Sequence, residues 1–478
     1  MAHDQYESPL CGRYSSKKMQ RLFSDDHKFA GWREVWYKMA SAQQAQGAPI
    51  SDEQLSEMVG HIFDPIEYDK VAELEKELRH DVIAHATEFG RVCPTAAPII
   101  NLGGTSCDTT DNVDLHIMRK ALGFIEAGLA RVIDRLARFA KQYRSLPVLG
   151  STHYQAAALT TVGKRACMWA QNFLMDLQFL EWVRGSLRFR GLKGATGTQA
   201  SFLELFEGDH GKVLAAEKQF AAAFGFSDVF TITGQTYPRK VDSRILGVLG
   251  SIALSASKMA TDIRLLAHDK EMDEPFEKGQ KGSFGMPFKK NAMRDERACS
   301  LSRIPMVMEW AAQVTEAIQW LERSLDDSAA RRIYVSESFL AVDAILRIVQ
   351  NVTEGLVVYP KVIEGRIGKE LPFMAIEKFL VAMIKAGADR FECHEKLRVH
   401  SMAAAGVVKN EGGNNDLLDR LRADDYFRPI HGILDSLLDP ASFIGRAPEQ
   451  VNEFLENEVG PALARFKDVL GGTAELSV

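Results

Sequence analysis

ILGVLGSIALSASKMATDIRLL, residues 245–266, carries the most regular pattern in the chain. Its apolar residues recur in alternating steps of four and three, which places them along one face of a single long helix. Several small residues lie between them, and small residues let neighbouring helices approach closely. The segment therefore predicts a long, tightly packed helix with this apolar seam: Ile245, Leu249, Ile252, Ala256, Met259, Ile263 and Leu266.

Three further segments, 118–139, 157–188 and 334–358, show helical periodicity. The first repeats the alternating steps of four and three. Alternating apolar and polar runs with hairpin turns, which indicate strands, are sparse. We therefore predict a mainly α protein with a bundle of four or five long helices between residues 110 and 360. The seam of the first segment consists of Met118, Leu122, Ile125, Leu129, Val132, Leu136 and Phe139.

These long segments are apolar on more than one face. Together they carry more apolar surface than a monomeric bundle can bury. Burial against other copies of the chain explains the excess, so we expect a homo-oligomer with the long helices in a shared core. We also predict three domains: an N-terminal helical domain at 1–110, a central long-helix domain at 111–358 and a C-terminal helical domain at 359–478. A glycine loop ends the first domain, and Tyr359-Pro360 ends the second.

Composition narrows the class of protein. The chain has 478 residues, of which 46% are hydrophobic and 26% charged, with a net charge of -6 at pH 7. No basic stripe with interleaved aromatics is present, so we do not expect nucleic acid as a partner. No apolar run is long enough to span a membrane, and the N-terminal stretch does not resemble a secretory signal, so we expect a cytoplasmic protein without membrane contact. The six cysteines form no CxxC pair, which disfavours disulfides and a metal site.

Two polar stretches precede the predicted helices. Arg79, His80 and Asp81 are followed by the loop 103–106, whose glycines and hydroxyls suit binding of an anion by backbone N–H groups. The alternative is a solvated helix face and an ordinary connection.

His153, in the stretch STHYQ, is expected at the entrance of the helix at 157–188, where it could donate a proton because its unperturbed pKa of about 6.5 is near neutral. The alternative is a histidine that only caps or packs.

Two glycine-rich stretches follow. GLKGATGTQASF, residues 191–202, lacks the Gly-Lys-Ser/Thr ending of a phosphate-binding P-loop, so nucleotide hydrolysis is excluded and a tight turn is favoured. The stretch 274–300, EPFEKGQKGSFGMPFKKNAMRDERACS, combines glycines, one hydroxyl and several cations, which suits a loop that binds an anion and closes over it. Asn291 is expected to cap the helix that follows. The alternative is a solvated basic loop.

KGSFGMPFKKNAMRDE, residues 281–296, resembles the signature sequence of the fumarase/aspartase superfamily. Within it the chain is similar to the adenylosuccinate lyases of the animal type. The similarity continues, in family order and over nearly the full length, through RHDVIAH, NLGGTSC, STHYQ, TTVGKR, RFRGLKGATGTQASFLELFEGD, TITGQTYPRKVD, ERSLDDSAARR and EGLVVYPKVIEGRIGKELPFMA.

This resemblance implies a three-domain fold whose long central helices form a homotetrameric core, with each active site assembled from three subunits. It implies cleavage of adenylosuccinate to AMP and fumarate, and of SAICAR to AICAR and fumarate, in purine biosynthesis. The partners would be purine nucleotide substrates, and neither a metal nor an organic cofactor would be needed.

The implied β-elimination needs a base at the succinyl carbon and an acid at the departing nitrogen. By resemblance, Ser283 is the base, His153 is the acid, and Glu296 orients the histidine. Because a free serine is too weak a base at pH 7, cations and backbone donors of the closed loop must shift its proton affinity, with Lys289 the nearest candidate. Lys289 and Asn291 resemble the family's ligands for the succinyl carboxylate.

Further residues match family positions that bind the substrate. The substrate carries one phosphate and two carboxylates, so several cations should surround it. The matching residues are Arg13, Tyr14, His80, Asp81, Thr105, Ser106, Thr152, Gln235, Arg323, Ser328 and Arg332.

The sequence departs from the signature at Phe284, Gly285, Phe288 and Ala292, where the family usually has Ser, Ala, Tyr and Pro. The first two change bulk and freedom in the loop and therefore bear on its closure. An argininosuccinate lyase-like enzyme is an alternative, against which ERSLDDSAARR and TGTQASF argue. A non-catalytic structural relative, as lens crystallins are, is another, and the retained set of Ser283, His153, Lys289 and Glu296 argues against it.

Overall fold

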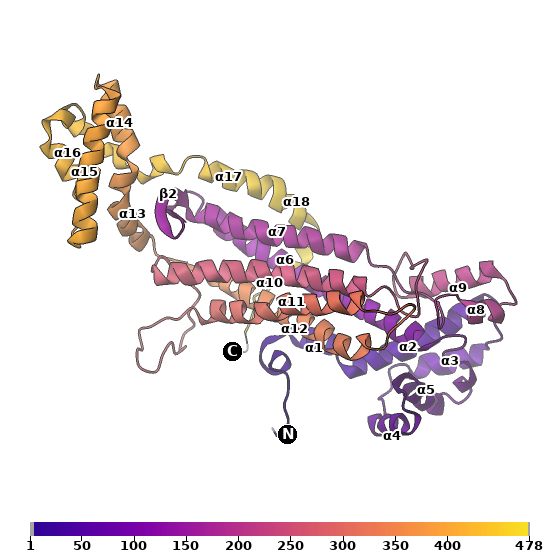
Figure 1. Ribbon diagram of the computed structural model, residues 1–478. Helices are drawn as coiled ribbons and strands as arrows, with labels where there is room; N and C mark the ends of the chain where they lie inside the picture. The colour runs from indigo at the N-terminus through magenta and orange to yellow at the C-terminus, as the bar shows by residue number, and fades with distance from the viewer. Residues whose placement is uncertain (1–3, 477–478) are drawn as a thin grey trace.

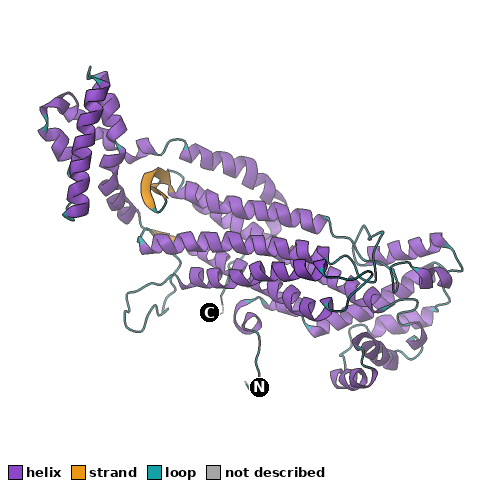
Figure 2. Cartoon of the chain, in the orientation of Figure 1, coloured by secondary structure: helices purple, strands orange, loops and turns teal. Residues whose placement is uncertain are grey.

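The computed structural model describes residues 4–476, and it is built almost entirely of helices (Figures 1 and 2). The five longest helices run side by side as one bundle, in which α10 contacts α7, α11 and α12, while α6 contacts α7 and α12. This arrangement confirms the prediction of a mainly α fold with a long-helix bundle. The five helices are α6 (Ser106–Gln142), α7 (Val162–Gly185), α10 (Lys240–His268), α11 (Met293–Ala317) and α12 (Asp327–Gly355).

The two predicted seams lie in α6 and α10, and all fourteen of their apolar positions are buried. The small residues of α10 act as expected where it meets α11. A Cβ at Gly250 would lie 3.7 Å from the α11 backbone at Pro305 and Met306, so the two helices pack closely at this position. The alternating pattern therefore identified both the helices and the faces through which they pack.

A β-hairpin that the sequence pattern does not indicate precedes α7. Strand β1 (Pro147–Thr152) pairs antiparallel with β2 (Gln155–Thr161), and a two-residue turn joins them. Both turn residues have left-handed backbones, His153 with φ 54° and Tyr154 with φ 58°, as expected for a type I′ turn. The helix predicted from residue 157 therefore begins at Val162, and His153 lies at a hairpin tip instead of a helix entrance.

The N-terminal helices pack around one end of the bundle (Figure 1). Helix α2 lies along α6 and α9, and the Trp36 Nε1–H donates to Thr109 Oγ1 at 2.8 Å. The elements at this end are α2 (Asp25–Ala45), α3 (Asp52–His61), α4 (Tyr68–Leu78), α5 (Asp81–Val92), η2 (Ala97–Ile99), α8 (Ala200–Leu205) and α9 (His210–Ala223). Of the first turns, η1 (Leu10–Tyr14) contacts α12, and α1 (Lys17–Leu22) contacts α12, α6 and α2.

The C-terminal elements form a module at the other end of the bundle, next to the β1–β2 hairpin (Figure 1). Helices α14 to α16 and the turns after them have an apolar core of their own, whereas Ile363, Ile367 and Leu371 of α13 belong to the main core. The last segment then returns along the bundle, where Val451 and Val459 join the main core. The bounds are α13 (Pro360–Met374), α14 (Ile376–Lys385), α15 (Arg390–Asn410), α16 (Leu417–Ala423), η3 (Asp425–Ile433), η4 (Ser436–Leu438), η5 (Pro440–Phe443), α17 (Ala447–Phe454), η6 (Leu455–Val459), α18 (Gly460–Leu463) and η7 (Ala464–Val469).

The division into three domains at residues 110 and 358 stays a prediction, and its outermost residues, 1–3 and 477–478, lie outside the described chain. A second small sheet joins β3 (Met272–Asp273) to β4 (Val357–Val358), so the segment after α10 meets the end of α12. Among the described helices, none combines the length and apolar character needed to cross a bilayer.

The outer surface of the bundle carries large apolar side chains that this single chain leaves uncovered. Met175 and Trp182 on α7, Leu254 on α10, and Val307 and Trp310 on α11 are each more than half exposed. These side chains match the apolar excess noted in the sequence.

Candidate active site

The 274–292 loop links β3 to α11 and projects from the end of the bundle nearest the C-terminal module (Figure 1). Its tip is open to solvent, because Phe284, Phe288 and Lys289 are all exposed. Its two arms meet at Gly282, where an added Cβ would lie 1.8 Å from the Lys289 carbonyl oxygen. Only glycine fits there, and the approach places Ser283 next to the segment that carries Lys289.

Hydrogen bonds within the loop fix this approach. The Asn291 Nδ2–H donates to the Gly282 carbonyl oxygen at 2.8 Å, and the Ser283 Oγ accepts from the Met286 N–H at 3.4 Å. Three residues with predicted roles, Ser283, Lys289 and Asn291, therefore lie in one small turn. Glu296, also given a role, lies on the exposed side of the first turn of α11.

The expectation that Asn291 caps α11 is wrong. The helix begins at Met293, and the carboxylate of Glu274 accepts hydrogen bonds from the Arg294 N–H at 2.9 Å and the Asp295 N–H at 3.0 Å. Glu274 lies twenty residues before Arg294 and satisfies free N–H groups of the helix from outside it. The sequence pattern favoured the nearer asparagine because capping is normally local.

His153 and Thr152 lie on the exposed tip of the β1–β2 hairpin. The His153 imidazole has no hydrogen-bond or ion-pair partner within residues 4–476, so its two ring nitrogens are open to a ligand or another subunit. Glu296 makes no hydrogen bond to this ring in the described chain. A single copy of the chain therefore does not assemble the predicted histidine–glutamate pair.

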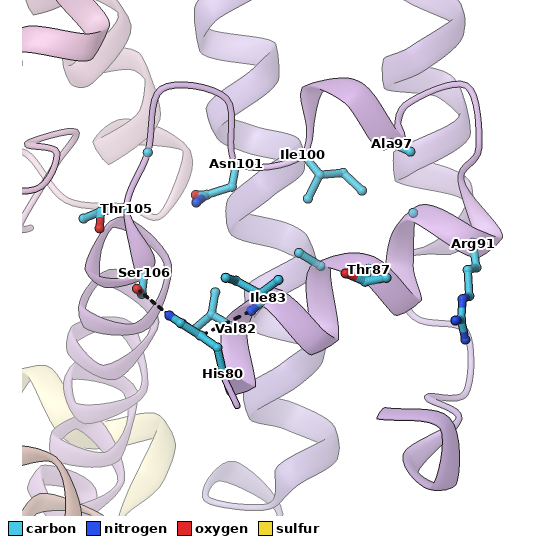
Figure 3. A pocket seen from close by; sticks show the side chains of 13 residues that line it. His80, Val82, Ile83, Thr87, Arg91, Ala97, Ile100, Asn101, Thr105 and Ser106 are labelled. Atoms are coloured by element: carbon cyan, nitrogen blue, oxygen red, sulfur yellow. Dashed lines mark hydrogen bonds between the residues drawn. The ribbon is translucent and has the colours of Figure 1, made fainter. Parts of the chain in front are cut away.

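A second group of predicted residues meets at the opposite end of the bundle, beside α5. The His80 Nε2 lies 3.4 Å from the Ser106 Oγ, and the Arg332 Nη2–H donates to the Asp81 carboxylate at 2.9 Å. Figure 3 shows α5 and the 97–106 segment on two sides of a cavity of about 710 Å³. The cavity is lined by His80, Thr105 and Ser106, together with Ile83, Thr87, Arg91, Ile100 and Asn101 among others.

Gln235 and Arg323 join this group. The Arg323 Nη1–H donates to Gln235 Oε1 at 2.8 Å and lies 3.1 Å from the Cys107 sulfur. Because Oε1 accepts from a guanidinium, the amide orientation is fixed and Nε2 is left to donate elsewhere. Burial raises the pKa of the Cys107 thiol to about 12, so this thiol stays neutral beside the arginine.

Arg13 and Tyr14 form a third group, against α12. The Tyr14 carbonyl oxygen accepts from Arg347 at 2.9 Å, and the Arg297 guanidinium lies 5.6 Å from the centre of the Tyr14 ring. Ser328 and Arg332 are four residues apart in the first turns of α12 and so share one face of that helix. The predicted residues therefore fall into separate groups in one chain: the 274–292 loop, the hairpin tip, the α5 cavity with its neighbours, and the N-terminal turn.

The chain has relatives among known proteins. Two family profiles match, "Lyase" over residues 37–302 and "Adenylosuccinate lyase C-terminus" over residues 372–454. The adenylosuccinate lyase of Saccharomyces cerevisiae is 50% identical over 470 residues, 98% of each chain, and that of Schistosoma mansoni is 47% identical over 477 residues, 99% of each. The chain belongs to the adenylosuccinate lyase family. This finding confirms the resemblance given by the motifs and leaves the argininosuccinate-type alternative without support.

Solved structures of other enzymes have the same fold as this chain. The 3-carboxy-cis,cis-muconate lactonizing enzyme of Pseudomonas putida matches with a TM-score of 0.82 at 22% identity, over 96% of this chain and 100% of that one. A fumarate lyase of Mesorhizobium sp. BNC1 matches with a TM-score of 0.79 at 21% identity, over 95% and 100%. These likenesses confirm the lyase-type helical fold.

A buried ionic network that the sequence pattern does not indicate joins α6 to the starts of α10 and α12. Arg239 donates to both oxygens of Asp111, at 3.0 and 3.1 Å, and to Asp327 at 2.7 Å. Burial alone would raise the pKa of Asp111. The guanidinium groups of Arg239 and Arg331 outweigh burial and hold this pKa below its ordinary value. The first turns of α6 carry three acids, Asp108, Asp111 and Asp114, among other polar residues, so no local signal in the sequence indicates that Asp111 is buried.

The network fixes the region that carries Arg323. Asp327 is fully buried, and its Oδ1 lies 3.9 Å from an Arg323 terminal nitrogen. Arg323 therefore lies beside a buried, ion-paired cluster, and its partly exposed guanidinium can be presented to an anion.

Proposed function

We propose that this chain cleaves adenylosuccinate to AMP and fumarate, and SAICAR to AICAR and fumarate, by acid–base β-elimination in purine biosynthesis. The observation that carries this proposal is the near full-length similarity to adenylosuccinate lyases, with 50% identity to the yeast enzyme. The retained acid–base and anion-binding residues support it, because they supply the chemistry that the reaction needs.

Ser283 is the base of this mechanism and His153 is the acid. The base takes the proton on the succinyl carbon next to a carboxylate, the C–N bond breaks, and the acid protonates the departing nitrogen. An imidazole suits the second task, because histidine is the side chain that most often transfers protons in catalysis. Serine becomes basic enough only when the loop closes, with Lys289 and backbone N–H groups stabilising the negative charge that develops.

The α5 cavity and its neighbours bind the anionic substrate in this proposal. Arg323 and Arg332 can each grip a phosphate or carboxylate bidentately. The Gln235 amide, held through its oxygen by Arg323, offers its N–H groups to the substrate. His80, Ser106 and Thr105 add donors along the cavity. Lys289 and Asn291 bind the succinyl carboxylate, and Thr152, Arg13, Tyr14, Asp81 and Ser328 complete the site.

The active site is shared among three subunits of a homotetramer. Helix α10 begins five residues after Gln235 and ends a few residues before the 274–292 loop, and a 29-residue helix is about 43 Å long. One substrate cannot contact both ends of that helix in a single chain. The exposed apolar side chains of α7, α10 and α11 supply a surface for the partners.

The reaction as proposed uses only proton transfer and anion binding, so we propose no metal or organic cofactor, and we place the protein in the cytoplasm. The test is an absorbance assay of the purified chain with adenylosuccinate and with SAICAR. We expect fumarate release from both. Release from argininosuccinate alone would favour the other lyase class, and no release from any of the three would favour a non-catalytic relative.

A further inference from the structure

The two ends of the 274–292 loop are tied together at its base. Glu274, at the start of the loop, is 5% exposed and its carboxylate accepts the backbone N–H groups of Arg294 and Asp295. These two residues form the first turn of α11, directly after the loop. A single buried side chain therefore joins the strand before the loop to the helix after it.

The Arg294 side chain also bonds to the start of the loop. Its Nη1–H donates to the Pro275 carbonyl oxygen at 3.0 Å, and its Nη2–H donates to the Glu277 carboxylate at 2.6 Å. Pro275 in turn packs on the end of α12, where a Cβ at Gly355 would lie 2.6 Å from the proline ring. The base of the loop is thus fixed on two helices, whereas its tip is exposed.

We propose that Glu274, Arg294 and Asp295, here called the loop clasp, are positioning residues for the lyase reaction. They hold the base of the loop so that its free tip presents Ser283 and Lys289 in one direction and closes reproducibly over the substrate. This inference rests on the proposed function, and it assigns a role to residues that touch neither substrate nor reacting atoms.

The chemistry of the clasp explains how two buried acids are tolerated. Asp295 is 1% exposed, and its Oδ2 accepts no conventional hydrogen bond within residues 4–476. Burial and the adjoining Glu274 carboxylate raise the pKa of Asp295 well above its ordinary value. This shift favours the neutral form of Asp295, and the Glu274 carboxylate faces the N-terminus of α11, where the helix dipole stabilises its negative charge.

Few other charges face this pair. Arg294 lies beside it, Arg264 approaches from α10, and the Cys299 thiol lies one turn further along α11. An asparagine at position 295 imitates the protonated acid, whereas an alanine at position 274 removes the acceptor of both N–H groups. These two substitutions separate the charge of the clasp from its geometry.

The experiment compares kcat, KM and melting temperature for wild type, Glu274→Ala and Asp295→Asn. We expect Glu274→Ala to lower kcat about 10- to 100-fold with a smaller change in KM, because a misplaced catalytic group costs turnover more than binding. Asp295→Asn should keep kcat within a few-fold and lose less activity than wild type as the pH is raised, since it cannot ionise.

Asp389→Ala is the matched control. Asp389 also accepts two backbone N–H groups at a helix start, those of Phe391 and Glu392 at 2.9 Å each, but it does so in the C-terminal module. Its loss should lower the melting temperature without lowering kcat. A folded Glu274→Ala protein with wild-type kcat, or equal losses of kcat in Glu274→Ala and Asp389→Ala, would overturn the proposal.

A second readout does not depend on activity. The loop contains the trypsin sites Lys278, Lys281, Lys289 and Lys290. Glu274→Ala should be cut there several-fold faster than wild type, and Asp389→Ala should not. If the wild type proves inactive on every lyase substrate, the proposed function fails; faster cutting would still support the clasp as a structural tie, and unchanged cutting would overturn that as well.

Discussion

His153 and Ser283 both lie on protruding, exposed segments, and neither is needed to hold the fold together. His153 occupies a hairpin tip, and Ser283 accepts only a long hydrogen bond within its own loop. Surface side chains of this kind usually change stability by less than about 0.5 kcal/mol when they are replaced. Their replacement therefore tests chemistry separately from folding.

His153→Ala and Ser283→Ala should each give a folded protein whose turnover of adenylosuccinate is lower by about two to four orders of magnitude, as expected when a general acid or base is lost. Steady-state kinetics with circular dichroism on the same samples would measure this. Near-normal turnover in either variant would remove that residue from its proposed role.

Phe284 stands where the family signature usually has serine, and its side chain is fully exposed in the open loop. It therefore obstructs nothing in this conformation, and an apolar ring at the tip suits sealing of a closed site against water. Phe284→Ser should leave kcat/KM unchanged or lower it. Phe391→Ser, at an exposed phenylalanine on α15, is the control and should change nothing. A several-fold rise in kcat/KM for Phe284→Ser would show that the native ring impedes closure.

At the scale of elements, the sequence predicted the long helices because their apolar residues repeat regularly over many turns. The β1–β2 hairpin escaped because its turn, His153 and Tyr154, lacks the Asn-Gly or Asp-Gly pair that normally indicates a type I′ turn. The cap of α11 escaped because Glu274 is distant in sequence from the helix it caps. Local sequence patterns therefore predicted the long helices, which depend on local periodicity. The hairpin turn and the cap of α11 depend on backbone conformation and on a distant contact, which local patterns do not indicate.

The packing of α5 against α2 makes a prediction about pH. His85 is buried against the Phe29 ring, with ring centres 3.8 Å apart, and burial lowers its pKa to about 4. Between pH 6.5 and 4 the unfolded chain binds a proton that the folded chain does not, so the free energy of unfolding falls on acidification. One such group changes the free energy of unfolding by at most about 1.4 kcal/mol per pH unit.

His85→Phe keeps an aromatic ring on Phe29 and removes the titration, so stability should decline less steeply below pH 6.5. Urea unfolding at several pH values would measure the slope. His394→Asn, at an exposed histidine on α15, is the control and should keep the wild-type slope. An unchanged slope for His85→Phe would mean that His85 is not the group responsible.

For the whole molecule, the predicted site residues could be named from motifs, but their separation in space could not. The 274–292 loop and the hairpin tip lie at one end of the bundle and the α5 cavity lies at the other, because α10 carries the chain the length of the molecule between Gln235 and the loop (Figure 1). The sequence has more apolar positions than one bundle can bury, which indicated contact with other copies of the chain. The exposed Trp310 and Met175 are two of these positions. Which copies meet, and where, depends on interfaces that one chain does not contain.

Shared active sites make a prediction that a self-contained site does not. If His153 and Ser283 of one site come from different subunits, mixing inactive His153→Ala and Ser283→Ala chains should restore activity. Random assembly at equal amounts gives both native residues to about a quarter of the sites. The mixture should be dissociated and reassembled before assay. Each variant reassembled alone is the control and should stay inactive. Sedimentation of an active monomer, or no recovery in a reassembled tetramer, would rule out sharing of these two residues between subunits.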